Sequence, residues 1–443
     1  MAILIAIILS PLLLLLFQWL KRRPLHSLPL PPGPKGVPVL GNMFDIPSSM
    51  PWKQFREWSN SYGDVLYLKT PTQAVVVLGS AQAALDLLDK RSDIYSSRPH
   101  IRMLDIVSPR PWNFAVMEYG PRWRTYRRQF HQFFHQHAVS DYQPIQLQQS
   151  RAFLQRALDE PDGLSHHIHL IYSAIILKVV YDMDVTNMHD EYIQIAEEAL
   201  SALSQVQVPG KFWVESLPIL RYVPNWLPGA YFKKWALKYG PIIDEMVDKP
   251  FDAVMQNIAL GKAGPSVVTN MTEKIQGNAS VSGELGRNER EEIARGVTGA
   301  AYGAAADTTT AAAQSFFIAM SLYPDVQRKA QQELDRIVGP DRLPDFDDYD
   351  NLIYIQAVAL ECMRWMPVAP IGMAHSVIRD DEYKGLFIPK GTMIIANQWA
   401  MLHDPDDYPE PERFNPDRFI RGGGLDPDVR SPTMISFGFG RRK

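Results

Sequence analysis

The first twenty residues of this chain contain no charged side chain. At about 1.5 Å of rise per residue, a helix of this length spans roughly 30 Å, the thickness of the apolar core of a bilayer. Lys21, Arg22 and Arg23 follow directly, and positive charge beside a membrane helix marks its cytosolic side. Segment 1–20 therefore predicts a transmembrane anchor. A cleaved signal peptide is the alternative, but the basic start and small-residue cleavage site that it needs are not found here.

Residues 21–38 form a basic and proline-rich stretch after the predicted anchor. Five prolines fall among the eleven residues from Leu28 to Pro38, which excludes a helix or a central strand and predicts a stiff, extended linker. The chain contains no internal repeat, and its overall hydrophobic content of 46% can bury a large core, which suits one large domain or two medium ones. The net charge of −4 gives no argument for a nucleic-acid partner.

Helical patterns dominate residues 39–443, and the predicted fold class is mainly α with small β-sheets. Periodicity predicts helices over 52–62, 81–88, 121–137, 146–158, 165–181, 189–206, 229–258, 288–321, 325–338 and 350–365. Residues 64–69 and 73–78 are rich in Val, Leu and Tyr around a Thr-Pro-Thr turn and predict a hairpin, while 372–378 and 392–397 predict further short strands. Residues 262–287 contain few large apolar side chains and predict a surface connection.

An acid and three threonines interrupt the predicted helix 288–321. Asp307 is followed directly by threonines beginning at Thr308, and these residues are poor helix formers. One interpretation is structural: the hydroxyls bond to the preceding turn and the acid is solvated. The other is an acid–alcohol pair at a pocket, where small residues such as Ala304 let a flat ligand approach and Asp307 relays protons.

Two further predicted helices carry charged residues at helical spacing. Glu361 and Arg364 are three residues apart, where opposite charges can pair, but many helices carry such a pair by chance and at a surface it contributes under about 1 kcal/mol. Trp123 and Arg127 lie one turn apart, with His131 a further turn along. An amphipathic helix with an arginine reaching to solvent would also explain the second pattern.

The last eight residues alternate glycines with aromatic and cationic side chains. Gly438 and Gly440 would let the backbone turn tightly and approach a flat object. Arg442, two residues after the second glycine, could meet a carboxylate at the edge of that object. A flexible basic tail is the alternative interpretation.

Taken together, these motifs resemble those of the cytochrome P-450 family, in the family's order along the chain. Phe437-x-x-Gly440-x-Arg442-x resembles the start of the haem-binding signature. Residues 304–309 resemble the oxygen-activation motif, with Ala305 in place of the usual glycine. Glu361-x-x-Arg364 together with Pro411-Glu-Arg413-Phe resembles the structural triad, in which both arginines would hold the glutamate beneath the haem.

The resemblance also implies roles for individual residues. Asp307 and Thr308 would be catalytic, while Ala304, Phe437, Gly440 and Arg442 would bind haem. Trp123-x-x-x-Arg127 resembles the family's pair that contacts a haem propionate, and His131 could join it. His375 would be a further propionate partner, although the family usually has proline where Ala374 stands.

The resemblance implies the cytochrome P-450 fold, in a microsomal and fungal type of enzyme anchored in the endoplasmic reticulum membrane by a single span. Haem b, iron protoporphyrin IX, would be the cofactor. One atom of O2 would enter a small apolar organic substrate. Electrons would come from NADPH-cytochrome P-450 reductase, docked on Arg127, Arg128, Arg441 and Lys443.

The iron ligand is expected to be a cysteine directly after Lys443, so no metal ligand is assigned within this chain. Cys362, between Glu361 and Arg364, is instead expected to be a small buried hydrophobe. Two alternatives stay open: a chain that truly ended here would be an inactive fragment, and a relative of this family could be an isomerase or dehydratase. Retention of Asp307 and Thr308 argues against the second.

Overall fold

The computed structural model of the protein describes residues 28–443 apart from 48, 209, 227–228 and 278–285. The predicted anchor at 1–20 therefore lies outside the described residues. Within them, one helical segment, Pro161–Tyr181, is long and apolar enough to cross a membrane. More than half of its apolar window, 56%, is buried inside the fold, as expected for a helix of the protein core.

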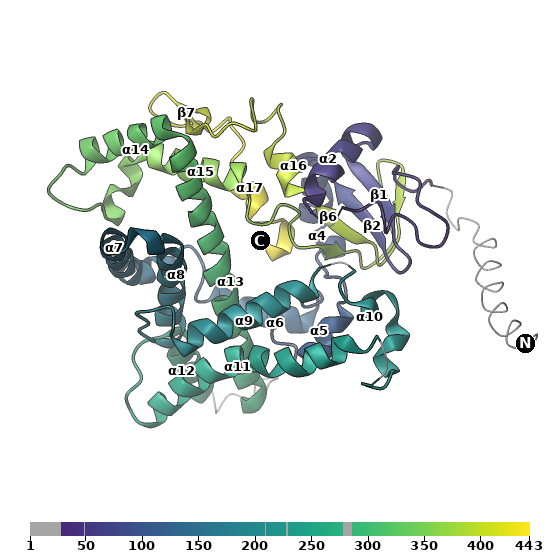
Figure 1. The fold of residues 1–443 in the computed structure, drawn as a ribbon, viewed down its shortest axis with the longest axis horizontal. Coiled ribbons are helices and arrows are strands. Elements are labelled where there is room, and N and C mark those ends of the chain that lie inside the picture. Colours follow the sequence, from purple (N-terminus) through teal and green to yellow (C-terminus); the bar gives the residue numbers. More distant parts are fainter. Residues whose placement is uncertain (1–27, 48, 209, 227–228, 278–285) are drawn as a thin grey trace, which may run out of the picture.

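Helix α13 (Arg287–Leu322) runs through the middle of the molecule, and other helices pack around it (Figure 1). A Cβ added at Gly296 would lie 2.6 Å from the ring of Tyr126, so this glycine lets helix α6 approach α13 closely. The other α-helices among the described residues are α2 (Pro51–Tyr62), α3 (Ala81–Ala84), α4 (Ser92–Tyr95), α5 (Arg102–Val107), α6 (Pro121–His131), α7 (Gln143–Asp159), α8 (Leu164–Tyr181), α9 (Glu191–Val206), α10 (Trp213–Ser216), α11 (Tyr231–Ala259), α12 (Val267–Gly277), α14 (Pro324–Ile337), α15 (Ile353–Trp365), α16 (Gln398–Leu402) and α17 (Thr433–Ser436).

A four-stranded sheet lies to one side of α13, next to α2 and α16 (Figure 1). Its order is β1 (Val65–Lys69), β2 (Ala74–Leu78), β6 (Met393–Ala396), β3 (His375–Ser376). β1 and β2 form the predicted antiparallel hairpin, β6 runs parallel to β2, and β3 pairs antiparallel with β6. Two small hairpins complete the strands, β4 (Asp381–Tyr383) with β5 (Leu386–Ile388) and β7 (Ile420–Arg421) with β8 (Gly424–Leu425).

The proline-rich stretch packs on these strands from Pro29 onward. The carbonyl of Pro29 accepts the N–H of Phe387 at 2.8 Å, and that of Pro32 accepts the N–H of Tyr67 at 2.8 Å. A Cβ at Gly33 would lie 2.0 Å from the carbonyl oxygen of Tyr67, so only glycine fits there. The stretch is extended, as its prolines predict, and it covers an edge of the sheet.

The predicted class, mainly α with small sheets, is confirmed, and most helices begin and end within a few residues of their predicted bounds. Three local predictions are wrong. Helix α6 ends at His131, because residues 132–137 form turns. The predicted helix 81–88 changes to a π-helical segment at Leu85–Asp89. The predicted surface connection contains α12, whose apolar residues Val267, Val268 and Met271 share one buried face.

Candidate functional site

A cavity of about 980 Å³ lies between α13, α15, strand β3 and the C-terminal loop. Thr308, His375, Phe437 and Arg442, all predicted as site residues, line it. Figure 1 shows the C-terminus in the centre of the molecule, next to α17 and α13. Most of the wall is apolar, and its members come from four helices: Phe153, Ile168, Ile171, Phe316, Phe317, Ile355 and Val358.

One end of the cavity is cationic, and its charge comes from two arginines. Arg98 donates from Nη1 to the carbonyls of Met373 and Ala374, at 2.7 and 2.8 Å. Arg442 donates to the carbonyls of Ser96, Phe114 and Met117, at 2.8, 3.1 and 2.6 Å. These bonds fix both guanidinium groups at the wall, and no carboxylate of the described residues forms an ion pair with either of them.

The electrostatics of this end favour an anionic ligand. Among the described residues that line the cavity, none carries a carboxylate. Burial lowers the pKa of Arg98 to about 10, and burial together with Arg98 and Arg127 lowers the pKa of Arg442 to about 9. A buried charge of one sign needs a partner. The two carboxylates of a porphyrin edge would supply that partner, so these residues fit the haem that the sequence implies.

His375 lies beside the two arginines and is neutral in this environment. Burial first, and then Arg98 and Arg442, lower the pKa of His375 to about 3. Its Nδ1 lies 2.7 Å from the carbonyl of Tyr95, so Nδ1 carries the proton and donates to that oxygen. The ring is thereby held in place, with Nε2 left for a ligand in the cavity.

The C-terminal loop is fixed by a close approach to the segment after α3. Gly440 has a φ of +63°, and a Cβ there would lie 2.1 Å from the carbonyl oxygen of Leu88. Its N–H donates to Oδ1 of Asp89 at 2.9 Å. Phe437 and Phe439 both line the cavity, but Phe439 is buried whereas Phe437 is exposed. Gly440 is therefore needed for the loop itself rather than for contact with a ligand.

The predicted pair on α6 lies behind Arg442 instead of lining the cavity. Trp123 is buried, and the guanidinium of Arg442 lies over its ring, 4.5 Å from the centroid. Arg127 is half-buried, and its Nη2 donates to the carbonyl of Lys443. Both side chains therefore hold the loop that carries Arg442, and the aromatic face stabilises the cation.

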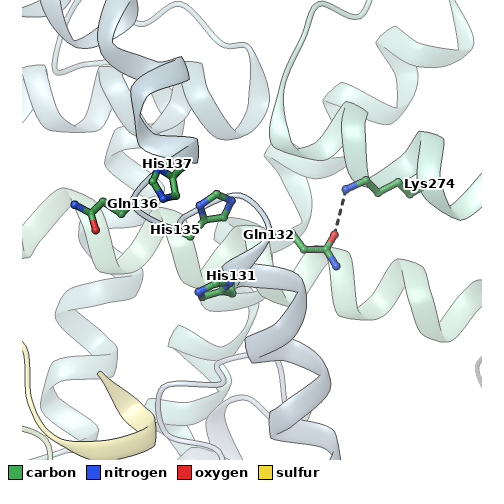
Figure 2. A pocket seen from close by; sticks show the side chains of 6 residues that line it. All are labelled: His131, Gln132, His135, Gln136, His137 and Lys274. Atoms are coloured by element: carbon green, nitrogen blue, oxygen red, sulfur yellow. Dashed lines mark hydrogen bonds between the residues drawn. The ribbon is translucent and has the colours of Figure 1, made fainter.

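His131 does not join this pair, so its prediction as a haem contact is wrong. Eight residues after Trp123, a helix has turned about 80° away from it, and His131 is the exposed last residue of α6. Its side chain lines an open surface groove of about 690 Å³. In this groove Lys274 donates to Oε1 of Gln132 at 3.1 Å, and Figure 2 shows this pair together with His131. The groove also contains His135, Gln136 and His137.

On α13, the acid and the alcohol face different ways. Thr308 lines the cavity, and its hydroxyl donates to the carbonyl of Ala304 at 2.7 Å. Ala304 and Asp307 are not among the residues that line the cavity. Burial raises the pKa of Asp307 and a neighbouring histidine, His169, lowers it. Asp307 therefore lies behind the hydroxyl, on the side of α8.

The buried cluster around Glu361 differs from the prediction in one member. Arg364 meets Glu361 with two bonds of 2.7 and 2.9 Å, and neither side chain is exposed. Arg418 supplies the second guanidinium, with Nε 3.3 Å from the carboxylate and 6% of the side chain exposed. The prediction that Arg413 holds Glu361 is wrong, because its side chain is 66% exposed and pairs with Glu410. Only its carbonyl contributes, accepting from Arg364 at 3.2 Å.

Two residues of the site, Arg98 and Arg418, are not predicted from the sequence. Arg418 could have been found, because Pro416-Asp-Arg418-Phe repeats the proline–acid–arginine–phenylalanine pattern of 411–414 five residues later. Arg98 lies in an irregular segment after α4, and no periodicity or charge spacing singles it out. Its position depends on the fold bringing residue 98 next to 373–374.

Cys362 behaves as the sequence predicts. It is buried, and burial together with the charge of Glu361 raises the pKa of the thiol to about 12. A thiolate, the form that ligates metals, is therefore disfavoured at this position. Within the described part of the chain, no group of three or more His, Cys, Asp and Glu side chains is arranged to hold a metal ion.

Comparison with known proteins identifies the family. A sequence model of the cytochrome P-450 family matches residues 31–443. The cytochrome P-450 monooxygenase COX2 of Coprinopsis cinerea is 41% identical over 412 residues, covering 93% of this chain and 78% of the relative. The tryptamine 4-monooxygenase of Psilocybe cyanescens is 35% identical over 418 residues, covering 93% and 81%. The matched region includes the cavity, the Glu361 cluster and the C-terminal loop, and the chain therefore belongs to the cytochrome P-450 family of monooxygenases, among its fungal members.

Proposed function

We propose that the cavity binds haem b, with the propionates at its cationic end, held by Arg98, His375 and Arg442. The observation that carries this proposal is the pair of buried arginines whose bonds go to backbone carbonyls in a cavity wall without carboxylates. Thr308 also lines the cavity, and its hydroxyl can turn from the Ala304 carbonyl toward a ligand there.

Haem ligated by a thiolate supplies oxygen activation and the transfer of one oxygen atom to a substrate. We propose a small apolar organic substrate, because the remaining wall consists largely of aliphatic and aromatic side chains that exclude water. Thr308 would hold a proton at its hydroxyl in the cavity, and Asp307 would supply protons from the side of α8. The cysteine ligand is proposed to follow Lys443, whose carbonyl Arg127 holds beside Arg442.

The enzyme would act at a membrane and would receive electrons from a reductase. Residues 1–20 would anchor it in the endoplasmic reticulum membrane, and the basic residues 21–23 would keep the catalytic domain cytosolic. An NADPH-dependent reductase would deliver electrons to the exposed basic residues beside the C-terminal loop. The apolar, uncharged character of 1–20 and the exposure of Arg128, Arg441 and Lys443 support these assignments.

The test uses the membrane-bound protein extended through the proposed cysteine. Haem content and the carbon-monoxide spectrum of the reduced protein are measured first. Incorporation of heavy-isotope oxygen from O2 into products of an apolar substrate panel is measured second. Arg442→Ala should lower haem retention severalfold, while Arg336→Ala, an exposed residue on α14, should leave it unchanged. Equal haem retention in both variants would refute the propionate assignment, and a wild type without haem would refute the function.

A further inference from the structure

Three helices contribute to a charged cluster outside the cavity: His169 on α8, Glu197 on α9 and Asp307 on α13. Nδ1 of His169 lies 2.9 Å from Oε1 of Glu197, and Nε2 lies 3.8 Å from Oδ1 of Asp307. The histidine side chain is only 18% exposed, whereas the carboxylates are 45% and 56% exposed. A simple surface ion pair involves one carboxylate, but here the two ring nitrogens face two carboxylates.

The geometry favours proton transfer over metal binding. The two carboxylates face opposite nitrogens of one ring, so all three groups cannot surround a single ion. An imidazole with a partner at each nitrogen can gain a proton at one side and release one at the other. The gap of 3.8 Å to Asp307 is longer than a direct hydrogen bond, and a bridging water or a rotation of the carboxylate would close it.

Asp307 connects this cluster to the cavity. It does not line the cavity, but Thr308, the next residue, does. The acid faces the histidine, and the residue that follows it on α13 lines the cavity. Tyr302 also lies near Asp307 and Glu197, but its hydroxyl donates to the carbonyl of Tyr192 at 2.9 Å and is occupied.

We propose that His169 is a positioning residue that relays protons from solvent at Glu197 to Asp307, and from there to the cavity at Thr308. The proposal rests on the proposed function, since reduction of oxygen at the cavity is what consumes the protons. In one transfer, Nδ1 accepts a proton from the Glu197 carboxyl, Nε2 releases its own to Oδ1 of Asp307, and water reprotonates Glu197. One water then takes the proton from Nδ1 and another returns one to Nε2, which restores the starting tautomer.

The experiment compares His169→Gln and Glu197→Gln with wild type in the haem-loaded, membrane-bound protein supplied with reductase. His166→Gln is the matched control, because His166 is an exposed histidine on the same helix. The first readout is product formed per NADPH consumed, measured across pH. The second does not depend on turnover: the protonation of Asp307 is followed by infrared difference titration, with Asp307→Asn identifying its carboxyl signal.

His169→Gln should lower the amount of product formed per NADPH by about ten-fold or more. The electrons of NADPH would then reduce O2 to hydrogen peroxide instead. The Asp307 carboxyl should then protonate at higher pH, because the coulombic effect of His169, which lowers the pKa of Asp307, has been removed. Glu197→Gln should lower coupling less, since water can still reach His169. His166→Gln should match wild type in both readouts. Unchanged coupling and an unchanged Asp307 titration in His169→Gln would overturn the relay, whereas a wild type without product overturns the proposed function instead.

Discussion

Glu361 is a fully buried carboxylate that two arginines hold in place. The bidentate bonds from Arg364 satisfy one side, and Arg418 closes the other with a side chain that is itself almost fully buried. A buried charge that loses a partner keeps its desolvation cost. The cluster also ties α15 to the irregular segment after α16, because Arg364 donates to the carbonyls of Leu402 and Pro411, at 3.0 and 2.8 Å.

Arg418→Ala should therefore destabilise the fold by roughly 3 kcal/mol, whereas Arg413→Ala should cost under about 1 kcal/mol, since its exposed pair with Glu410 is screened by solvent. The two arginines are five residues apart in similar sequence contexts, so each controls for the other. The free energies of unfolding of the two variants, measured by urea titration, test this difference. Equal losses, or a larger loss for Arg413→Ala, would contradict the assignment of Arg418.

Substitution of Gly440 tests the close approach of the C-terminal loop to Leu88. Gly440→Ala must strain a backbone with a φ of +63° and also move the Leu88 carbonyl, 2.1 Å from the new Cβ. Gly438→Ala has the same kind of backbone, with a φ of +82°, but no atom within 4 Å of its Cβ. The expected cost is about 1–2 kcal/mol for Gly438→Ala and distinctly more for Gly440→Ala. Thermal unfolding of both variants measures the difference, and matching midpoints would show that the approach to Leu88 is unimportant.

At the scale of elements, sequence periodicity was sufficient for long helices and insufficient for short segments. α13 and α8 were predicted closely because their apolar patterns extend over many turns. β4 and β5 were missed, as each has three residues that pair only with one another. The same limit applies to the site. Thr308 and Arg442 lie in recognisable motifs, whereas Arg98 and His169 depend on contacts between segments far apart in the chain.

His403, directly after α16, should make the packing of this element pH-dependent. Burial first, and then Arg364, Arg56 and Lys53, lower the pKa of His403 to about 3. In the unfolded chain the His403 ring binds a proton below about pH 6.5, whereas in the folded protein the ring stays neutral down to about pH 3. Stability should consequently fall as pH drops through this window, by up to about 1.4 kcal/mol per pH unit from this residue.

His403→Gln removes the titrating group and retains an amide. Urea unfolding at several values between pH 7 and pH 5 should show a shallower decline for the variant than for wild type. His166→Gln, with its exposed side chain, should keep the wild-type decline. If His403→Gln lost stability with the wild-type slope, the acid sensitivity would have to come from other groups.

At the scale of the whole molecule, the cavity proposed to bind haem is assembled from segments across the full described length. Arg98 comes from the first quarter of the chain, Thr308 from α13 and Arg442 from the C-terminal loop. The loop also reaches the surface, where the guanidinium groups of Arg124 and Arg441 lie 5.7 and 5.4 Å from the ring centroid of Tyr119. The cationic end of the cavity therefore lies near an exposed basic surface.

We expect the reductase to dock on this basic surface, which consists of the exposed residues Arg124, Arg128, Arg441 and Lys443. Arg128→Glu should slow the first electron transfer by about ten-fold at low ionic strength, because a reversed charge opposes an acidic partner, and salt should abolish the difference. Substrate affinity, measured by spectral titration, should not change, since Arg128 is not among the residues that line the cavity. Arg336→Glu on α14 is the charge-matched control. Stopped-flow reduction at two salt concentrations separates the outcomes: equal slowing in both variants would indicate an effect of net charge and exclude docking at this surface.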